Sequence, residues 1–80
     1  MKVRVHVQRR PGIADPEGST TAQALRSLGF DGVQEVSIGR AIDVEVATDD
    51  AGSALDQVEA MCKQLLTNPV LEDFDLEVLA

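Results

Sequence analysis

The stretch VQEVSIGRAIDVEV (residues 33–46) decides which fold the rest of the chain can adopt. Residues 33–38 carry three apolar side chains, Val33, Val36 and Ile38, and residues 42–46 alternate apolar with acidic side chains. Gly39-Arg40 stands between the two runs as a break. This pattern predicts two strands joined as a hairpin. The acidic side chains of the second strand should face away from any covering helix.

Upstream of this stretch, KVRVHVQ (residues 2–8) alternates valine with polar side chains, which is typical of a half-buried strand. Asp15 then precedes Pro16, an N-cap acceptor followed by a proline at the first helical position. We expect a helix from there to about Leu28. A left-handed C-cap at Gly29-Phe30 should end it, with the phenylalanine folding back toward the helix.

Downstream, a second helix should begin at Asp49 or Asp50 and close at Asn68-Pro69, where proline cannot continue it. The last segment, VLEDFDLEVL (residues 70–79), alternates apolar with acidic side chains and predicts a fourth strand. The helix carries one broad apolar face, formed by Ala54, Leu55, Val58, Met61, Cys62, Leu65 and Leu66.

The predicted order is β-α-β-β-α-β over one α+β domain, residues 1–80. Right-handed crossovers fold this order into a two-layer sandwich, a four-stranded antiparallel sheet with two helices on one face (the ferredoxin-like split βαβ arrangement). The last strand then lies beside the first. Lys2 and Arg4 should face Asp75 and Glu77 across these strands.

The composition excludes several classes of function. The chain has 80 residues, 44% of them apolar and 2% aromatic, with a formal charge of -7. Such a charge would repel a phosphate backbone, so nucleic acid is not an expected partner. No apolar run is long enough to span a membrane. A single cysteine and the absence of a signal-peptide pattern indicate a cytoplasmic protein.

Arg9 and Arg10 precede a Pro-Gly turn and a helix start, an arrangement that can bind an anion. Acylphosphatases, whose strands and helices follow the same order, bind an anion with such an arrangement. They also need an asparagine to position water, and the only asparagine, Asn68, lies at the far end of the second helix. Asp15 and Glu17 would moreover compete with an anion for the helix N-terminus.

No catalytic or metal-binding group emerges from the rest of the sequence. His6 is the only histidine and lies on the outward face of the first strand. Cys62 lies on the apolar face of the second helix without a cysteine partner, so we expect core packing. No pair of a nucleophile and a base is apparent. The residues alone predict a binding or assembly module.

The sequence resembles the PurS family, the small subunit of phosphoribosylformylglycinamidine (FGAM) synthase. The resemblance lies in RPGIADPEG (residues 10–18), ALRSLGF (residues 24–30), IGRAIDVEV (residues 38–46) and MCKQLLTNPVLEDFDLEV (residues 61–78). It implies a subunit without activity of its own that bridges a PurQ glutaminase and a PurL synthetase, as a homodimer or higher oligomer. ATP and Mg²⁺ would be used by the large subunit, and this chain would bind no cofactor.

The arginine-rich corner then becomes an expected contact with the large subunit, because two prolines stiffen it and two arginines can pair with carboxylates. An ACT-like regulatory module, which binds a small molecule between paired subunits, remains the alternative. Four residues are expected to act structurally at the helix ends: Gly29, Phe30, Asn68 and Pro69. The expected partner-interface residues are Arg9, Arg10, Pro11, Gly12, Asp15, Pro16 and Gly18.

Overall fold

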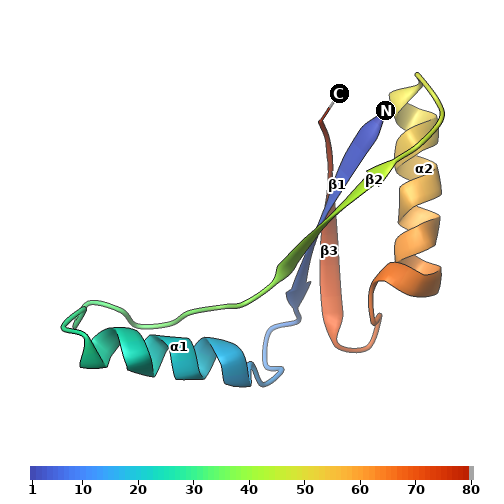
Figure 1. Cartoon of the computed structure of the whole chain (residues 1–80). Helices are drawn as coiled ribbons and strands as arrows, with labels where there is room; N and C mark the ends of the chain where they lie inside the picture. Colours follow the sequence, from blue (N-terminus) through green and yellow to red (C-terminus); the bar gives the residue numbers. More distant parts are fainter. Residues whose placement is uncertain (80) are drawn as a thin grey trace.

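The computed structural model describes residues 1–79 and contains three strands, two α-helices and a π-helical turn. In chain order the elements are β1 (Lys2–Arg9), α1 (Pro16–Ser27), β2 (Arg40–Glu45), α2 (Ala51–Met61), the π-turn η1 (Cys62–Leu66) and β3 (Glu72–Val78). Figure 1 shows α2 lying along one face of the sheet, while α1 projects away from it.

The sheet is antiparallel, with β1 in the centre and the order β2-β1-β3. The prediction that the last strand lies beside the first is therefore confirmed. The register sets Val3 opposite Val44 on one side and Val78 on the other, so the apolar positions of all three strands share one face. This face and α2 enclose the core, whose fully or nearly buried side chains are Val3, Val5, Val7, Val46, Ala54, Val58 and Cys62.

The predicted hairpin and the four-stranded sheet are wrong for the single chain. Residues 33–39 are extended but, within residues 1–79, pair with no strand, and this segment continues into β2 without reversing direction (Figure 1). Gly39 permits this course because its α-carbon passes close to β1, where an added Cβ would lie 2.5 Å from the Val7 carbonyl oxygen. Only one of the two helices, α2, covers the sheet.

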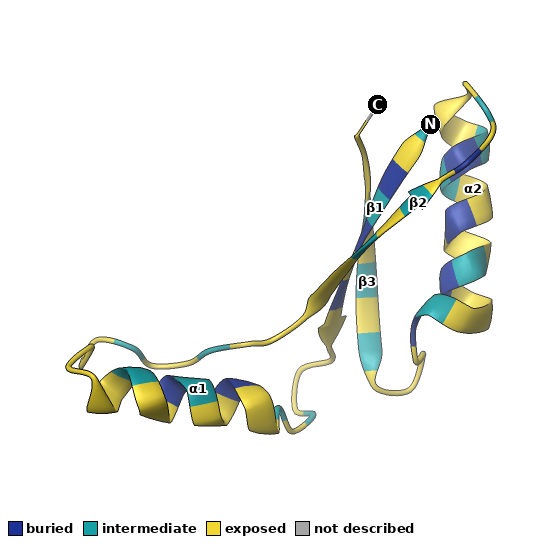
Figure 2. Ribbon diagram, viewed as in Figure 1, coloured by how far each residue is buried: buried dark blue, intermediate teal, exposed yellow. Residues whose placement is uncertain are grey.

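The arm, which we define as residues 10–39, comprises the loop after β1, α1 and the extended segment 33–39. Its residues are mostly exposed, whereas buried residues gather on β1 and on the inner side of α2 (Figure 2). The arm makes the molecule long, with extents of 48 × 26 × 13 Å and a radius of gyration of 15.9 Å. A compact domain of this length has a radius of gyration of about 12 Å.

The predicted limits of α1 are confirmed. The Asp15 carboxylate accepts a hydrogen bond from the Gly18 amide at 2.9 Å and caps the helix that begins at Pro16. At the other end Gly29 adopts φ 102°, and the Phe30 amide donates to the Leu25 carbonyl at 3.1 Å. The Phe30 side chain itself remains 58% exposed.

The second helix also begins as predicted, with Asp50 capping the Ser53 amide at 3.0 Å. Its end differs because residues 62–66 form a π-turn, closed by the Thr67 amide donating to the Cys62 carbonyl. The wider turn rotates Leu65 out of the apolar face. Leu65 is 83% exposed, so its predicted place in the core is wrong, whereas Cys62 is fully buried as predicted.

The uncovered face of the sheet carries the polar side chains of β1. Arg4 donates to Asp43 of β2 at 2.8 and 3.1 Å, which places Asp43 away from α2 as predicted. Arg4 lies opposite Glu77 in the register, but its ion pair is formed with the other neighbouring strand. His6, not Lys2 or Arg4, contacts Glu77, at 3.2 Å, so that the predicted pairing of these residues is wrong in detail.

One ion pair closes the core beneath α2. Arg40 at the start of β2 reaches across β1 and donates to both carboxylate oxygens of Glu72 on β3. A further hydrogen bond, 2.9 Å long, joins Arg40 to the Leu66 carbonyl, and the Asn68 amide donates to Glu72 at 2.8 Å. The pair therefore ties β2, the end of η1 and β3 together.

Candidate functional site

The corner, which we define as residues 9–18, links β1 to α1 and contains every residue of the predicted partner interface. It leaves the sheet where β1 ends at Arg9 and turns through Pro11 and Gly12. Gly12 has φ 86°, a conformation that favours glycine, and the Ile13 amide closes the turn by donating to the Arg10 carbonyl at 3.1 Å. The corner is thus a defined turn.

Asp15 connects the corner to the extended segment of the arm. One carboxylate oxygen caps α1 through Gly18, and the other accepts from the Ile38 amide at 2.9 Å. The hydrogen bond from Ile38, then that from Gly18, and the nearby Arg9 charge hold the pKa of Asp15 below its usual value. Asp15 is therefore a structural carboxylate of the arm, which the sequence showed only as a helix cap.

Gly18 allows a close approach, but the neighbouring backbone belongs to the same chain. A Cβ at Gly18 would lie 2.1 Å from the Val36 carbonyl oxygen and 2.7 Å from an oxygen of Asp15. Gly12, in contrast, has no atom within 4 Å of its Cβ position. Gly18 thus accommodates the backbone of the arm itself, and Gly12 serves the turn.

The two arginines of the corner differ in their surroundings. Arg10 is anchored to β3, because its amide donates to the Leu71 carbonyl at 2.9 Å and its guanidinium lies 3.3 Å from Asp73. Within residues 1–79 the Arg9 side chain forms no hydrogen bond or ion pair, and it is exposed. Arg9 is accordingly the corner cation that is available to a partner.

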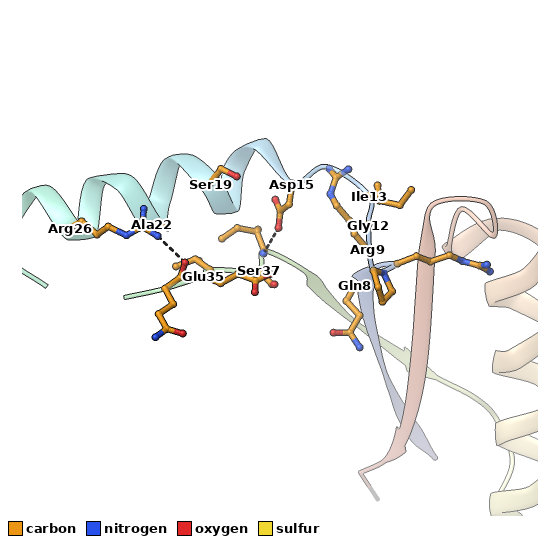
Figure 3. A pocket seen from close by; sticks show the side chains of 15 residues that line it. Gln8, Arg9, Gly12, Ile13, Asp15, Ser19, Ala22, Arg26, Glu35 and Ser37 are labelled. Atoms are coloured by element: carbon orange, nitrogen blue, oxygen red, sulfur yellow. Dashed lines mark hydrogen bonds between the residues drawn. The ribbon is translucent and has the colours of Figure 1, made fainter. Parts of the chain in front are cut away.

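Sequence reasoning missed the role of Arg26 in the last turn of α1. Its guanidinium donates to the carbonyls of Val33 and Gln34, both at 2.8 Å. Together with Asp15 it fastens both ends of α1 to the extended segment, as Figure 3 shows. A basic residue near a helix C-terminus is common, so no sequence pattern indicated this contact.

A groove of about 530 Å³ lies between the corner, α1 and the extended segment (Figure 3). Its polar lining includes Ser19 and Ser37 but, among the residues described, no histidine or cysteine to act with them as base or nucleophile. Of its charged groups, Asp15 and Arg26 are engaged by the backbone of the arm, and Arg9, Arg10 and Glu35 also line the groove. The groove therefore offers shape and charge for binding.

The surroundings of Asp15 and Asn68 do not fit the acylphosphatase type of active site, which occurs on the same strand order. The Asp15 carboxylate occupies the N-terminus of α1, where an anion would have to bind. Asn68 accepts the Val70 amide at 3.0 Å and is thereby engaged in a turn beyond η1.

No group of three histidine, cysteine, aspartate or glutamate side chains that could hold a metal ion occurs in residues 1–79. In the same part of the chain, no helix is long and apolar enough to cross a membrane. The fold and the corner define a class of protein, a small α+β binding subunit with a projecting arm.

Comparison with known proteins identifies the family. Residues 2–80 match the family described as PurS, phosphoribosylformylglycinamidine (FGAM) synthase, and the chain belongs to this PurS family. The synthase subunit PurS of a Synechocystis species is 39% identical over 77 residues, which are 96% of this chain and 77% of that protein.

Solved structures agree along the whole chain. The crystal structure of Methanocaldococcus jannaschii PurS superimposes with a TM-score of 0.85 at 37% identity, covering 95% of this chain and 92% of the other. A chain in the structure of PurLQS from Thermotoga maritima gives a TM-score of 0.89 at 32% identity, covering 98% and 95%. The projecting arm is thus part of an arrangement that these structures share.

Proposed function

We propose that this chain is the PurS subunit of FGAM synthase in purine biosynthesis and joins a PurL synthetase to a PurQ glutaminase. The complex converts formylglycinamide ribonucleotide, glutamine and ATP into formylglycinamidine ribonucleotide, glutamate, ADP and phosphate. The observation that carries the proposal is the full-length similarity to a chain of a PurLQS structure, with a TM-score of 0.89. We propose that PurL and PurQ supply the catalytic groups and that PurL uses ATP and Mg²⁺; among residues 1–79 of this chain, no cluster of metal-ligating side chains occurs.

The role has a physical rationale in the transfer of ammonia between two catalytic subunits. Ammonia is largely protonated in neutral water, and ammonium is not a nucleophile, so the path must exclude bulk solvent. A small rigid subunit can hold the two enzymes in register and seal the gap between them. We place this activity in the cytoplasm, and we expect the subunit to act as a homodimer or higher oligomer.

The corner is the proposed contact with PurL. Arg9 supports this assignment because it is exposed and unpaired in the described chain, and an arginine can form two parallel hydrogen bonds with a carboxylate. Arg9→Ala is expected to weaken binding to PurL while the fold persists. Lys2→Ala is the matched control, since it removes the same charge from the opposite end of β1.

Binding of both variants to PurL can be measured by surface plasmon resonance, with circular dichroism as the check on folding. An affinity lowered by Arg9→Ala and unchanged by Lys2→Ala supports the corner as the contact. Equal affinities for the two variants and the unmodified chain would remove the corner from the interface.

The function itself is tested by reconstitution. Purified PurL and PurQ are assayed for product with and without this chain, using either glutamine or an ammonium salt as the nitrogen source. We expect glutamine-dependent synthesis to require the chain and ammonium-dependent synthesis to proceed without it. If neither reaction changes and neither partner binds, the proposal fails, and calorimetry with glutamine or glycine then tests the ACT-like alternative.

A further inference from the structure

The outer edge of β3 carries backbone groups that no neighbouring strand uses. The Leu79 amide donates to the Lys2 carbonyl, and the Leu71 carbonyl accepts from the Arg10 amide, so the odd-numbered residues of β3 turn their backbone groups toward β1. The even-numbered residues therefore turn theirs outward. Within residues 1–79, β1 is the only strand that pairs with β3. An unpaired edge of this kind is a template for another strand.

A hollow of about 510 Å³ gives room for a chain beside the beginning of this edge. Asp73, Phe74 and Asp75 all line it, although successive residues of a strand face opposite sides of the sheet. The other lining residues come from the end of β1, from residues 63–69 and from Glu72. The hollow therefore reaches around β3 from one face of the sheet to the other.

The charges on the uncovered face of the sheet alternate from strand to strand. The central strand β1 carries basic side chains there, and both of its neighbours carry acidic ones. On β3, Asp73 lies 3.3 Å from Arg10, and Glu77 lies 3.2 Å from His6. Asp75 forms no ion pair or hydrogen bond within residues 1–79. Since opposite charges stabilise neighbouring strands, the next strand in this alternation would be basic.

We propose that the outer edge of β3 binds an extended segment of another protein in which basic and apolar side chains alternate. The segment runs antiparallel to β3. Its basic side chains lie beside Asp75 and Glu77 on the uncovered face. Its apolar side chains lie beside Phe74, Leu76 and Val78, on the face that α2 covers.

A second copy of this chain does not fit the same edge. Pairing of β3 with β3 would set acidic side chains against acidic ones, which is unfavourable. The segment of the sequence in which basic and apolar residues alternate is β1, and both of its edges are already used inside the sheet. The charge of the β3 edge therefore opposes self-pairing and favours a basic strand from a different protein.

A capped peptide with the β1 sequence, KVRVHVQR, is a suitable probe because it has the required alternation. It can be titrated into the isotope-labelled full-length chain and followed by NMR and amide hydrogen exchange. At saturation, exchange of the outward amides of Phe74, Leu76 and Val78 should slow about tenfold or more. A peptide with glutamate in place of each lysine and arginine is the control. Equal binding of the two peptides, or no binding of the basic one, overturns the proposal.

A pair of N-methylated probes tests the edge without changing the protein. Residues directly opposite each other in an antiparallel pair share a face, so the valines of the probe would turn their backbone groups toward β3. N-methylation of the three valine amides should therefore weaken binding about tenfold or more. N-methylation of the arginine, histidine and glutamine amides between them is the matched control and should leave binding unchanged. Equal losses would show that the probe replaces β1, which contradicts binding at the outer edge.

Asp75→Lys tests the charge of the site. It should raise the dissociation constant of the basic probe about three- to tenfold. Glu45→Lys is the matched control, because it makes the same charge change on the uncovered face of β2, and circular dichroism checks that both variants fold. An unchanged constant for Asp75→Lys, or an equal rise for both variants, would contradict the proposed site.

This inference goes beyond the proposed function, which places the contact with PurL at the corner. The peptide measurements use the isolated chain, so they can fail while glutamine-dependent synthesis still requires it. Conversely, a reconstituted reaction that does not need the chain leaves the binding of the peptide to β3 unaffected.

Discussion

Glu72→Gln is expected to destabilise the folded chain at neutral pH and to have a much smaller effect in acid. The Glu72 side chain is 15% exposed and accepts two hydrogen bonds from Arg40 and one, at 2.8 Å, from the Asn68 amide. These bonds, first those from Arg40 and then that from Asn68, hold the pKa of Glu72 below its ordinary value.

The magnitude follows from the number of bonds changed. Glutamine offers one acceptor oxygen in place of two, so one bond is lost and the others no longer involve a carboxylate. A hydrogen bond to a charged group contributes about 1.5–3 kcal/mol, against about 0.5–1.5 kcal/mol for a neutral one. Because the Arg40 side chain is 49% exposed, solvent reduces the difference. We expect a loss of about 1–2 kcal/mol, or a melting temperature lower by about 5–15 °C.

The pH dependence has a definite sign. A carboxyl group whose pKa is lowered by folding stabilises the folded state above its unfolded pKa, about 4.3 for glutamate. This contribution is lost as the pH falls through the lowered pKa of the folded state. The difference in unfolding free energy between Glu72→Gln and the unmodified chain should therefore be full at neutral pH and shrink in acid.

Urea unfolding followed by circular dichroism, at one protein concentration and a series of pH values, measures this difference. Asp75→Asn is the matched control, since it removes a charge from the same strand but no hydrogen bond of the described structure. It should change the free energy by less than about 0.5 kcal/mol. A Glu72→Gln loss that is equal at pH 7 and in acid would refute the electrostatic reasoning.

Two further experiments probe the arm and the core. Gly18→Ala should destabilise the arm, because the added Cβ would lie 2.1 Å from the Val36 carbonyl oxygen, and this clash outweighs the helix preference of alanine over glycine, about 1 kcal/mol. Gly32→Ala is the control, since no atom lies within 4 Å of its Cβ position. A more cooperative thermal transition for Gly18→Ala would contradict the clash. The Cys62 thiol should react with a disulfide reagent only as the chain unfolds, because burial raises its pKa and no solvent reaches it. Rapid labelling at neutral pH in the folded state would show that this part of the core opens.

Most of the local structure could be predicted from the sequence. Asp15-Pro16 and Asp50 begin the two helices, because a carboxylate beside free amides is a local interaction that needs no distant contact. The alternation in residues 2–8 set which side chains of β1 enter the core, since successive residues of a strand face opposite sides. The family resemblance was likewise visible in short segments along the whole chain.

The contacts of the candidate site were less predictable. Arg9 and Arg10 have the same residue type and adjacent positions, yet one is free and the other is bound to β3. Arg9 lies opposite Glu72, which Arg40 already binds, whereas Arg10 lies beside Asp73. The clamp of Arg26 on the extended segment likewise depends on how the arm packs.

The sequence by itself determined the helices, the strands and the faces that they bury, because each depends on backbone preferences and side-chain periods within a few residues. Only the tertiary structure decided the path of the chain at Gly39. Glycine permits both a turn and an extended strand there, so no local pattern selects between them. The choice depends on which strand edge residues 33–38 meet, and within residues 1–79 of the single chain they pair with none. The same sequence pattern therefore specifies an extended arm in place of a closed hairpin.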